Sequence, residues 1–344
     1  MKTKKLIAVI IAIIMLVGVF TACKNVDDPE QPSGIVDDTE EATTEEQTPE
    51  IVRVAVLKGP TGMQMSYLMH EVNSGTTTYK NNYSFVVESA PDVVNSAILS
   101  GEVDIAAIPS NAAAALFNKT NGKIKIIATN TLNVLQLLTN DATITSFADL
   151  EGKTIIASGE GTTAQYVLEK ILTENGLVIG ETVNIEYIAE HSESVTRAMN
   201  GTADIVVLPE PFATQLLSAD IGYNIGIDLN LAIDAARLNI IMGVYVVRTE
   251  FLEKYPTAVE NFLEDGLGTH TFLTSSVDVV ATYIEESDIM PAAVAAKAIP
   301  NIRFRFETGE KMKELCDGMF DMLFVINPQS IGGALPTADI YYTN

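Results

Sequence analysis

The chain has 344 residues and a formal net charge of −24, and its first fifty residues differ in composition from the rest. This length allows one large domain or two modest domains with a sizeable core. Residues 51–344 carry 17 basic and 35 acidic side chains without a basic stripe, which argues against nucleic acid or anionic lipid as a partner.

The first predicted element is an export signal. Lysines lie among residues 2–5, an apolar run of 15 residues extends from Leu6 to Phe20, and the small residues Thr21 and Ala22 precede Cys23. This order of charged, apolar and small residues is typical of a signal peptide, and the run is too short to span a bilayer comfortably. We therefore predict a signal peptide over residues 1–22. The cysteine that follows the signal can be read in two ways. Either Cys23 is part of the cleavage signal, or the chain has an ordinary signal peptide and Cys23 is incidental.

The second predicted element is a tether over residues 23–50. Its residues 24–50 contain ten acidic side chains, one lysine and no aromatic residue. Such a segment cannot bury enough apolar surface to fold, so we expect a solvated chain whose ends lie about 30 Å apart. The only other cysteine is Cys316, so we expect no disulfide within the mature chain and predict that Cys316 is buried in the core.

From Ile51 the chain alternates short apolar strands with helices. Strands are predicted over residues 52–57, 83–88, 103–108 and 123–129, and helices over 63–72, 91–100 and 110–118, with KGPTG at 58–62 as a loop. Alternation of this kind predicts a mostly parallel sheet with helices on its faces.

A second copy of this plan begins after residue 152. Strands are predicted over residues 153–157, 183–188 and 203–208, and helices over 164–176, 193–200 and 211–218. The stretch GEVDIAAIPSN at 101–111 recurs in altered form as GTADIVVLPEP at 201–211. In each copy we expect a glycine to end a helix and a proline to end the following strand. The repeat predicts two lobes built on one plan.

Several motifs together resemble one protein family. The ending of the signal on Cys23, the acidic tether, VAVLKGPTGM, GEVDIAAIPSN, ADIVVLPEPFAT and NPQSIGGALPTADIYY look like those of a solute-binding lipoprotein of a bacterial ABC importer. The branch is similar to nitrate, sulfonate and thiamine-precursor binding proteins. The resemblance implies an α/β periplasmic-binding-protein fold of type 2: two lobes, each a mostly parallel sheet flanked by helices, are joined by two crossover segments and close on a solute.

The resemblance also implies a setting and partners. Cys23 would carry the lipid that holds the protein at the extracytoplasmic face of the membrane, and an ABC-transporter permease would receive the solute. We expect the protein to be a monomer without a cofactor, a metal or catalytic residues. We expect it to contact the membrane through the lipid anchor alone.

The lobes follow from where the chain crosses between them. We predict crossovers over residues 128–141 and 239–251, which divide the chain into lobe 1 (51–138 plus 242–344) and lobe 2 (139–241). Helices are expected within residues 251–266, 275–287 and 309–326, and the C-terminal residues 331–344 are expected to pack as a loop against lobe 1.

The predicted binding residues follow the strands of both lobes, because ligands of open α/β sheets bind beyond the carboxyl ends of the strands. Helix N-termini at KGPTG and SGEGTT favour an anionic or strongly accepting group. Lobe 1 supplies Lys58, Gly59, Thr61, Gly62, Ser89, Ser110, Asn111 and Thr131, and lobe 2 supplies Gly159, Gly161, Thr162, Thr163, Glu210 and Pro211.

Two of these residues leave the charge of the solute open. Lys58 suits an anionic group, unless it is a solvated surface residue. Glu210 suits an amino group, unless it caps a helix. An oxyanion, a zwitterion and an aminopyrimidine-like solute are all consistent with this set.

Two other functions remain open at this stage: an enzyme on the same fold and a lipid-anchored solute sensor. The histidines His70, His191 and His270 are far apart and show no metal-binding or Cys–His spacing, and GEGTT lacks the lysine of a P-loop. The sequence therefore offers little support for catalysis, whereas a sensor would share every feature above.

Overall fold

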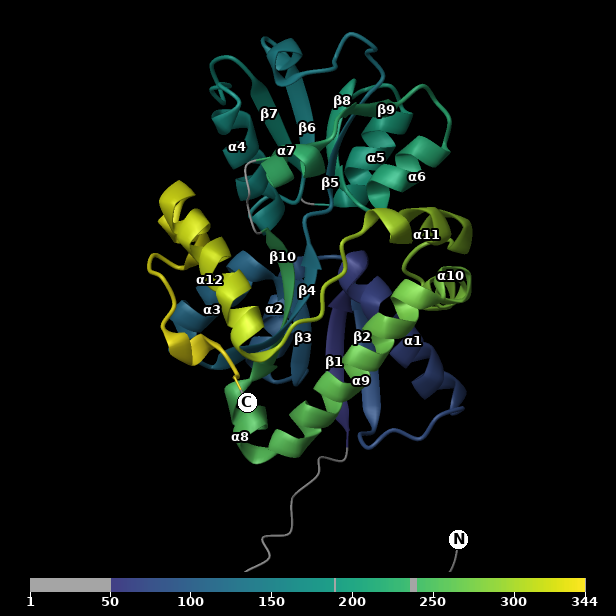
Figure 1. The fold of residues 1–344 in the computed structure, drawn as a ribbon, viewed down its shortest axis with the longest axis vertical. Coiled ribbons are helices and arrows are strands. Elements are labelled where there is room, and N and C mark those ends of the chain that lie inside the picture. Colours follow the sequence, from purple (N-terminus) through teal and green to yellow (C-terminus); the bar gives the residue numbers. More distant parts are fainter. Residues whose placement is uncertain (1–50, 189, 236–239, 344) are drawn as a thin grey trace, which may run out of the picture. The chain divides into compact units, whose positions relative to one another are not determined.

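The computed structural model describes residues 51–188, 190–235 and 240–343. The predicted signal peptide (1–22), Cys23 and the tether (23–50) lie outside these residues. The described residues belong to one compact unit that contains two five-stranded sheets (Figure 1). We call each sheet with its helices a lobe.

The sheet of lobe 1 has the order β2-β1-β3-β10-β4. Its strands are β1 (Val52–Leu57), β2 (Tyr83–Glu88), β3 (Ile105–Pro109), β4 (Ile124–Leu132) and β10 (Ile241–Arg248). Strand β1 runs parallel to β2 and β3, whereas β10 runs antiparallel to β3 and β4. The parallel strands β1, β2 and β3 therefore end at the same edge of the sheet.

The sheet of lobe 2 repeats this arrangement with the order β7-β6-β8-β5-β9. Its strands are β5 (Leu135–Thr139), β6 (Thr154–Ser158), β7 (Asn184–Ile188), β8 (Ile205–Pro209) and β9 (Asn224–Ile227). Strand β6 is parallel to β7 and β8, and β5 is antiparallel to β8 and β9. The α/β class is confirmed, and the antiparallel pairs in each sheet involve the strand that crosses from the other lobe.

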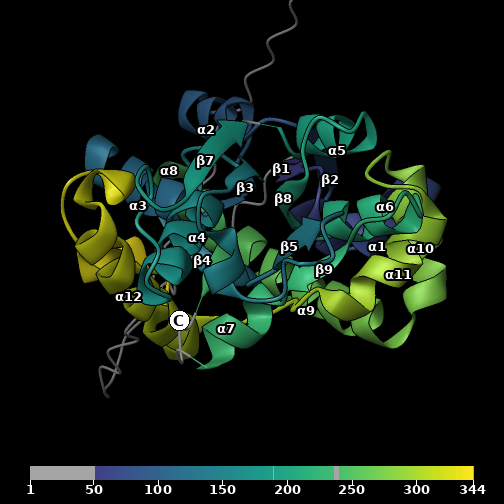
Figure 2. The same ribbon diagram turned by 90° about the horizontal axis from the view of Figure 1, so that it is seen from above.

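Helices cover both faces of each sheet, which explains why strands such as VRVAVL are apolar at nearly every position. In lobe 1 they are α1 (Pro60–Ser74), α2 (Pro91–Ser100), α3 (Ser110–Thr120), α8 (Thr249–Lys254), α9 (Pro256–Ser275), α10 (Val277–Glu286), α11 (Ala292–Ala298) and α12 (Gly309–Ile326). In lobe 2 they are α4 (Thr163–Glu174), α5 (His191–Met199), α6 (Phe212–Ser218) and α7 (Leu229–Ala235). Seen from above, α12 and α3 lie on one side and α10 and α11 on the other (Figure 2).

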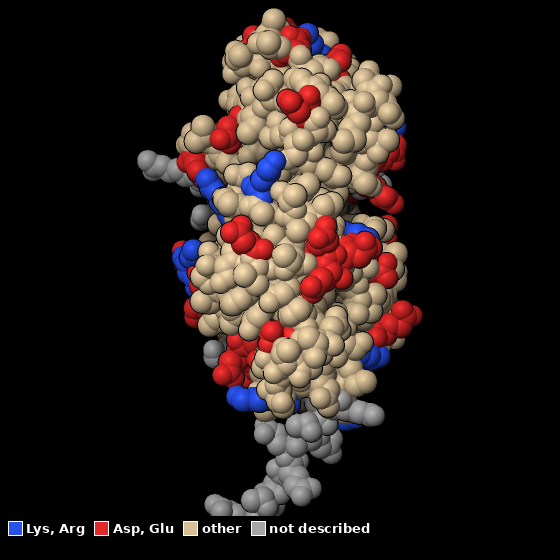
Figure 3. Space-filling view, turned by 90° about the vertical axis from the view of Figure 1, so that its right-hand side faces the viewer, with Lys and Arg blue, Asp and Glu red and all other residues tan. Residues whose placement is uncertain are grey.

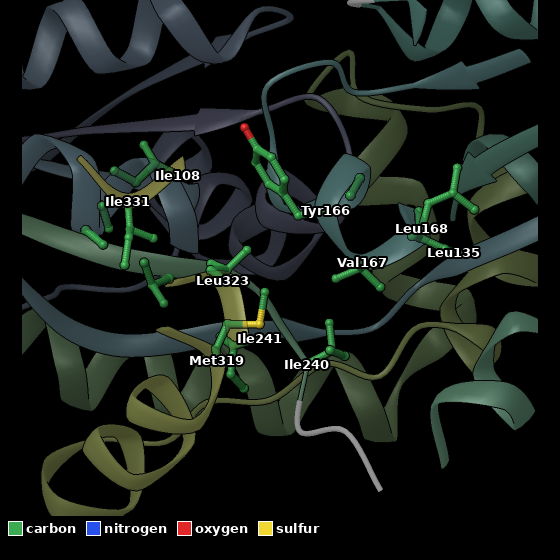
Figure 4. Packing of buried hydrophobic residues seen from close by; sticks show 14 of the residues in the cluster. Ile108, Leu135, Tyr166, Val167, Leu168, Ile240, Ile241, Met319, Leu323 and Ile331 are labelled. Atoms are coloured by element: carbon green, nitrogen blue, oxygen red, sulfur yellow. The ribbon is translucent and has the colours of Figure 1, made fainter. Parts of the chain in front are cut away.

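One hydrophobic cluster runs through both lobes. It joins Ile108 and Ile241 of lobe 1 to Leu135 and Val167 of lobe 2, and Met319 of α12 packs into it (Figure 4). As predicted, Cys316 is fully buried in this cluster. The C-terminal segment also packs on lobe 1 as predicted, since the backbone N–H of Tyr342 donates to the carbonyl oxygen of Ile126 at 2.9 Å.

The chain passes from the first sheet to the second and back again. The chain leaves the first sheet at Leu132 and enters the second at Leu135, and it returns into β10 at Ile241. Residue 239, at the start of the predicted return, is outside the described residues. Which residues divide the lobes stays a prediction.

Several predicted bounds differ from the structure by a few residues, and two of the differences have a clear local cause. KGPTG is not wholly a loop, because α1 begins at Pro60, where a missing N–H and a fixed φ suit the first helical position. The helix expected over residues 251–266 is two helices, since Pro256 restricts Tyr255 before it and starts α9, which continues to Ser275. Strand β9 and helices α7 and α11 were not predicted, because each is too short to show a clear period.

The surface charge and the helix lengths of the described residues can be compared with the needs of nucleic-acid and membrane partners. On the face shown in Figure 3, lysine and arginine side chains are scattered among acidic ones and form no stripe. Within the described ranges, no helix is long and apolar enough to cross a membrane.

Candidate functional site

The candidate site is a cavity between the two lobes with a volume of ≈ 100 Å³. Its apolar lining comes from both lobes and consists of Leu57, Pro60, Pro91, Pro109, Val134, Pro209 and Met242. Its polar side chains are those of Thr61, Thr131, Thr162, Thr163 and His191, and Ala164 and Gly243 complete the lining. Among the residues that the structure describes, no lysine, arginine, aspartate or glutamate lines this cavity.

Strand ends and helix starts meet at the cavity. The parallel strands β1, β3 and β8 end at Leu57, Pro109 and Pro209, and the helices α1, α2, α4 and α5 begin in its wall. The first N–H groups of a helix have no acceptor within the helix, and the helix dipole places partial positive charge there. The cavity therefore offers hydrogen-bond donors and positive potential without a formally charged side chain.

Hydrogen bonds join the lobes directly beside the cavity. The hydroxyl of Thr163 donates to Oδ1 of Asn111 at 3.0 Å and accepts from the backbone N–H of Asn111 at 3.3 Å. The Asn111 amide donates to the carbonyl oxygen of Gly161 at 2.9 Å, and Ser110 Oγ lies 3.1 Å from Thr163 Oγ1. Thr163 and Asn111 are buried, so the start of α3 in lobe 1 is held to the start of α4 in lobe 2.

Among the described residues, His191 is the histidine that lines the cavity. Its Nδ1 lies 2.7 Å from Oγ of Ser158, and its ring centroid lies 5.0 Å from that of Phe212. Burial lowers the pKa of His191 to about 4, so the ring is neutral at neutral pH. A neutral imidazole can present either a donor or an acceptor to a solute, depending on its tautomer.

The structure places the fourteen predicted binding residues in three groups. Thr61, Thr131, Thr162 and Thr163 line the cavity. Ser110, Asn111 and Gly161 form the hydrogen bonds between the lobes. The others, Lys58, Gly59, Gly62, Ser89, Gly159, Glu210 and Pro211, lie on the same strand-to-helix connections or in the first turn of α1 but outside the lining.

The two charged candidates have protein partners. The ammonium of Lys58 lies 2.7 Å from Oδ2 of Asp288 in an exposed ion pair. Glu210 is buried, and its Oε2 accepts from the backbone N–H of Thr214 in the first turn of α6 at 3.1 Å. Burial raises the pKa of Glu210, against hydrogen bonds from Thr214 and Asn301. This contact is the helix-capping role that the sequence left open for Glu210.

The backbone conformation at residue 159 explains why a glycine is found there. Gly159 has a φ of 86°, and a Cβ there would lie 2.8 Å from Oγ1 of Thr162. The hydroxyl of Thr162 donates to the carbonyl oxygen of Gly159 at 2.6 Å, which closes the turn. A side chain at residue 159 would break this turn and move the start of α4.

The predicted binding residues include neither His191 and Met242 nor any of the four prolines that line the cavity. The spacing of the three histidines bears on metal and imidazole chemistry and does not point to a role for His191 in solute binding. Met242 belongs to a strand whose antiparallel direction brings its first residues, not its last, to the cavity. The signal that could have found these residues is their position at the ends of strands. Their side-chain types alone would suggest that they are buried in the core.

The chain resembles solved structures in fold. An ABC transporter protein from Parabacteroides distasonis matches with a TM-score of 0.72 at 22% identity, covering 86% of this chain and 100% of that chain. The alkanesulfonate-binding protein SsuA from Xanthomonas axonopodis pv. citri, bound to MOPS, matches with a TM-score of 0.69 at 12% identity, covering 87% and 100%. The desulfurization enzyme DSZB matches with a TM-score of 0.61 at 12% identity, covering 86% and 97%. At these identities the likeness shows the fold alone.

Sequence comparisons give a narrower result. A comparison with curated proteins finds no match. A family model described as ABC transporter, phosphonate, periplasmic substrate-binding protein matches residues 67–267, which is more than half of the chain.

Proposed function

The chain belongs to the family of periplasmic substrate-binding proteins of ABC transporters that is named for phosphonate, and on this premise we propose that it captures a small polar solute between its lobes and delivers it to a permease. The observation that carries the proposal is the cavity where helix N-termini from both lobes converge. Its volume of ≈ 100 Å³ is well below the roughly 300–1,000 Å³ typical of sites for drug-sized ligands, which favours a small solute.

The solute that fits best carries an oxyanion or another strong acceptor. Free N–H groups at helix starts bind such groups without a charged partner. The neutral wall and the partners of Lys58 and Glu210 leave no free formal charge in the described lining to balance a net cation. Sulfonates, phosphonates, nitrate and carboxylates are therefore the first classes to test.

A thermal-shift screen tests this proposal. A solute that binds only the folded state, at a concentration 100-fold above its Kd, stabilises that state by about 2.7 kcal/mol. This moves the melting temperature by several degrees. We expect a shift with at least one oxyanion class and, in X-ray scattering, a more compact particle with that solute bound. Amino acids and pyrimidines complete the screen, and a shift confined to them would contradict the oxyanion preference.

The same samples decide between binding and catalysis. The likeness to DSZB shows that an enzyme can have a similar fold. We propose that this chain has no catalytic turnover, so mass spectrometry should recover the bound solute unchanged after long incubation. A converted solute would establish the enzyme alternative. Loss of uptake when the gene is deleted would favour transport, whereas unchanged uptake would favour a sensor.

We also propose that Cys23 is lipidated and anchors the protein at the extracytoplasmic face of the membrane. The Cys23→Ser variant should lose lipid labelling and leave the membrane fraction, because one covalent lipid on this residue is the predicted anchor. Chains starting at Lys24 and at Glu50 should melt at the same temperature, since the tether is predicted to add no packing. A membrane-bound, labelled Cys23→Ser protein would contradict the anchor.

A further inference from the structure

A buried polar relay leads from the cavity wall to the outer side of lobe 1. It consists of Thr131 and Asn130 on β4, Gln64 on α1, Tyr245 on β10 and His270 on α9. Gln64, Asn130 and Tyr245 are 0% exposed, and Thr131 lines the cavity. Four elements contribute one or two side chains each, so the relay joins distant parts of the chain.

Every member of the relay is linked by hydrogen bonds. Thr131 Oγ1 lies 2.6 Å from Oδ1 of Asn130. The other amide atom of Asn130, Nδ2, lies 2.6 Å from Oε1 of Gln64 and 2.6 Å from the hydroxyl of Tyr245. The Tyr245 hydroxyl lies 2.8 Å from Oε1 of Gln64, and Nε2 of Gln64 lies 3.2 Å from Nδ1 of His270. The chain from Thr131 to His270 is therefore unbroken.

Two hydrogen-bond directions satisfy the relay equally. In the first, Nδ1 of His270 accepts from Gln64, Asn130 donates to Gln64, and Thr131 donates its only proton to Asn130. In the second, Nδ1 of His270 is protonated and donates, both amides turn by half a rotation, and Asn130 donates to Thr131. An amide keeps its shape when oxygen and nitrogen exchange places, so the second direction needs no repacking.

We infer that this relay makes Thr131 a specificity-determining residue, whose hydroxyl accepts from the solute when Nδ1 of His270 is bare and donates to the solute when Nδ1 carries a proton. In the first direction the Thr131 proton is taken by Asn130, and lone pairs remain for the cavity. In the second direction the Thr131 proton is free for an acceptor of the solute. This inference rests on the proposed function, because it assigns a role in solute recognition.

The surroundings of His270 favour a neutral ring near neutral pH, which leaves Nδ1 bare in the Nε2–H tautomer. The charged groups that act on its ring are Arg305 and Glu307, from the segment between α11 and α12. Burial lowers the pKa of His270, Arg305 lowers it further, and Glu307 opposes both. The ring of Phe306 lies on one side, with its centroid at 6.5 Å.

Among the described residues, no other charged group acts on the ring of His270. α1 contributes the amide of Gln64 and the ring of Tyr67, which stacks on Phe272, and α10 contributes Tyr283 beside Tyr67. Acidification should therefore reverse the relay, and by linkage a solute that accepts from Thr131 should raise the affinity of His270 for its proton.

NMR of the histidine rings tests the relay without any solute. At about pH 8, above the usual histidine pKa of about 6.5, we expect the neutral ring of His270 in the wild-type protein to be the Nε2–H tautomer with a bare Nδ1, as the first direction requires. In Asn130→Asp the carboxylate can only accept, so Gln64 must turn and Nδ1 of His270 should become protonated. The matched control is Asn133→Asp, which places the same charge at a buried position on the same crossover, outside the relay.

Gln64→Glu is the second variant, because it places an acceptor-only group beside His270 itself. His70 and His191 are internal controls, whose ring signals should not change. A bare Nδ1 of His270 in either folded variant would overturn the relay, as would equal protonation in Asn133→Asp. These outcomes do not depend on the proposed function, which the solute screen tests separately.

A binding measurement tests the cavity end with ethanesulfonate, which accepts hydrogen bonds, carries no donor and does not titrate near neutral pH. We expect it to bind more tightly as the pH falls from about 8 to about 5.5, by up to about tenfold once Nδ1 of His270 is protonated, because one buried hydrogen bond to a charged group is then gained. His191 stays neutral over this range, since its pKa is about 4. His270→Phe should abolish the difference. Equal behaviour of ethanesulfonate at both pH values, or a difference that persists in His270→Phe, would overturn the coupling.

Discussion

Replacing Asp104 with alanine should lower the free energy of unfolding by about 3 kcal/mol, because it removes the acceptor of two arginine side chains. Asp104 is 1% exposed, and its carboxylate oxygens lie 2.6 Å from Arg53 and 2.8 Å from Arg248. Its Oδ2 also accepts from the backbone N–H of Arg53 at 3.0 Å. The expected loss is at the lower end for a buried pair, since 40% of the Arg53 side chain is exposed and can be hydrated.

The repeat supplies the matched control. Asp204 occupies the same place in the second copy of the motif, but it is exposed and its carboxylate lies 3.3 Å from the Asn140 amide. Asp204→Ala should therefore change the free energy of unfolding by no more than about 0.5 kcal/mol. Urea unfolding of both variants at neutral pH measures the contrast, and equal losses would contradict the assignment.

Acid should remove the contribution of Asp104. Burial raises the pKa of this carboxyl, but hydrogen bonds from Arg53 and Arg248 outweigh it and hold the pKa below its ordinary value. A depressed folded-state pKa stabilises the protein above the unfolded value of about 3.9, and this stabilisation is lost as the pH falls through the folded-state pKa. The difference between wild type and Asp104→Ala should thus be full near pH 7 and shrink below about pH 4.

The repeat was the most informative feature of the sequence. Gly101 adopts a left-handed φ of 81° at the end of α2, and Gly201 has a φ of 69° after α5, as predicted. Pro109 and Pro209 end β3 and β8. These features depend on residues close together in the chain, which is why sequence reasoning could find them. The same reasoning placed the site at the strand ends.

The side-chain partners could not be predicted, because they come from distant parts of the chain. Lys58 pairs with Asp288, 230 positions away, and Gln64 meets His270, 206 positions away. Gln64 lies on the buried face of α1 beside Met63 and Met65, so a glutamine among core methionines was the available signal for the relay. A polar residue on an apolar helix face calls for a partner, but the sequence does not identify it.

Thr163→Ala should weaken solute binding about ten- to a hundredfold, because Thr163 is where the two lobes are hydrogen-bonded across the cavity. The variant loses both bonds to Asn111 and the contact with Ser110, and it leaves the buried Asn111 without these partners. Closure around the solute should then be less favourable, whereas the hydrophobic clusters lose no side chain. The melting temperature without solute should therefore fall far less than the affinity.

Two substitutions separate this role from simple capping. Thr163→Ser keeps the hydroxyl and should bind nearly as tightly as the wild type. Thr162→Ala removes a hydroxyl whose bond stays within its own turn, so it should cost about 1 kcal/mol of stability and less affinity than Thr163→Ala. Calorimetry with the solute found by the screen gives the affinities, and X-ray scattering should show a more open Thr163→Ala protein. Equal loss of affinity in Thr162→Ala and Thr163→Ala would mean that the turn as a whole, and not the bond between the lobes, holds the solute.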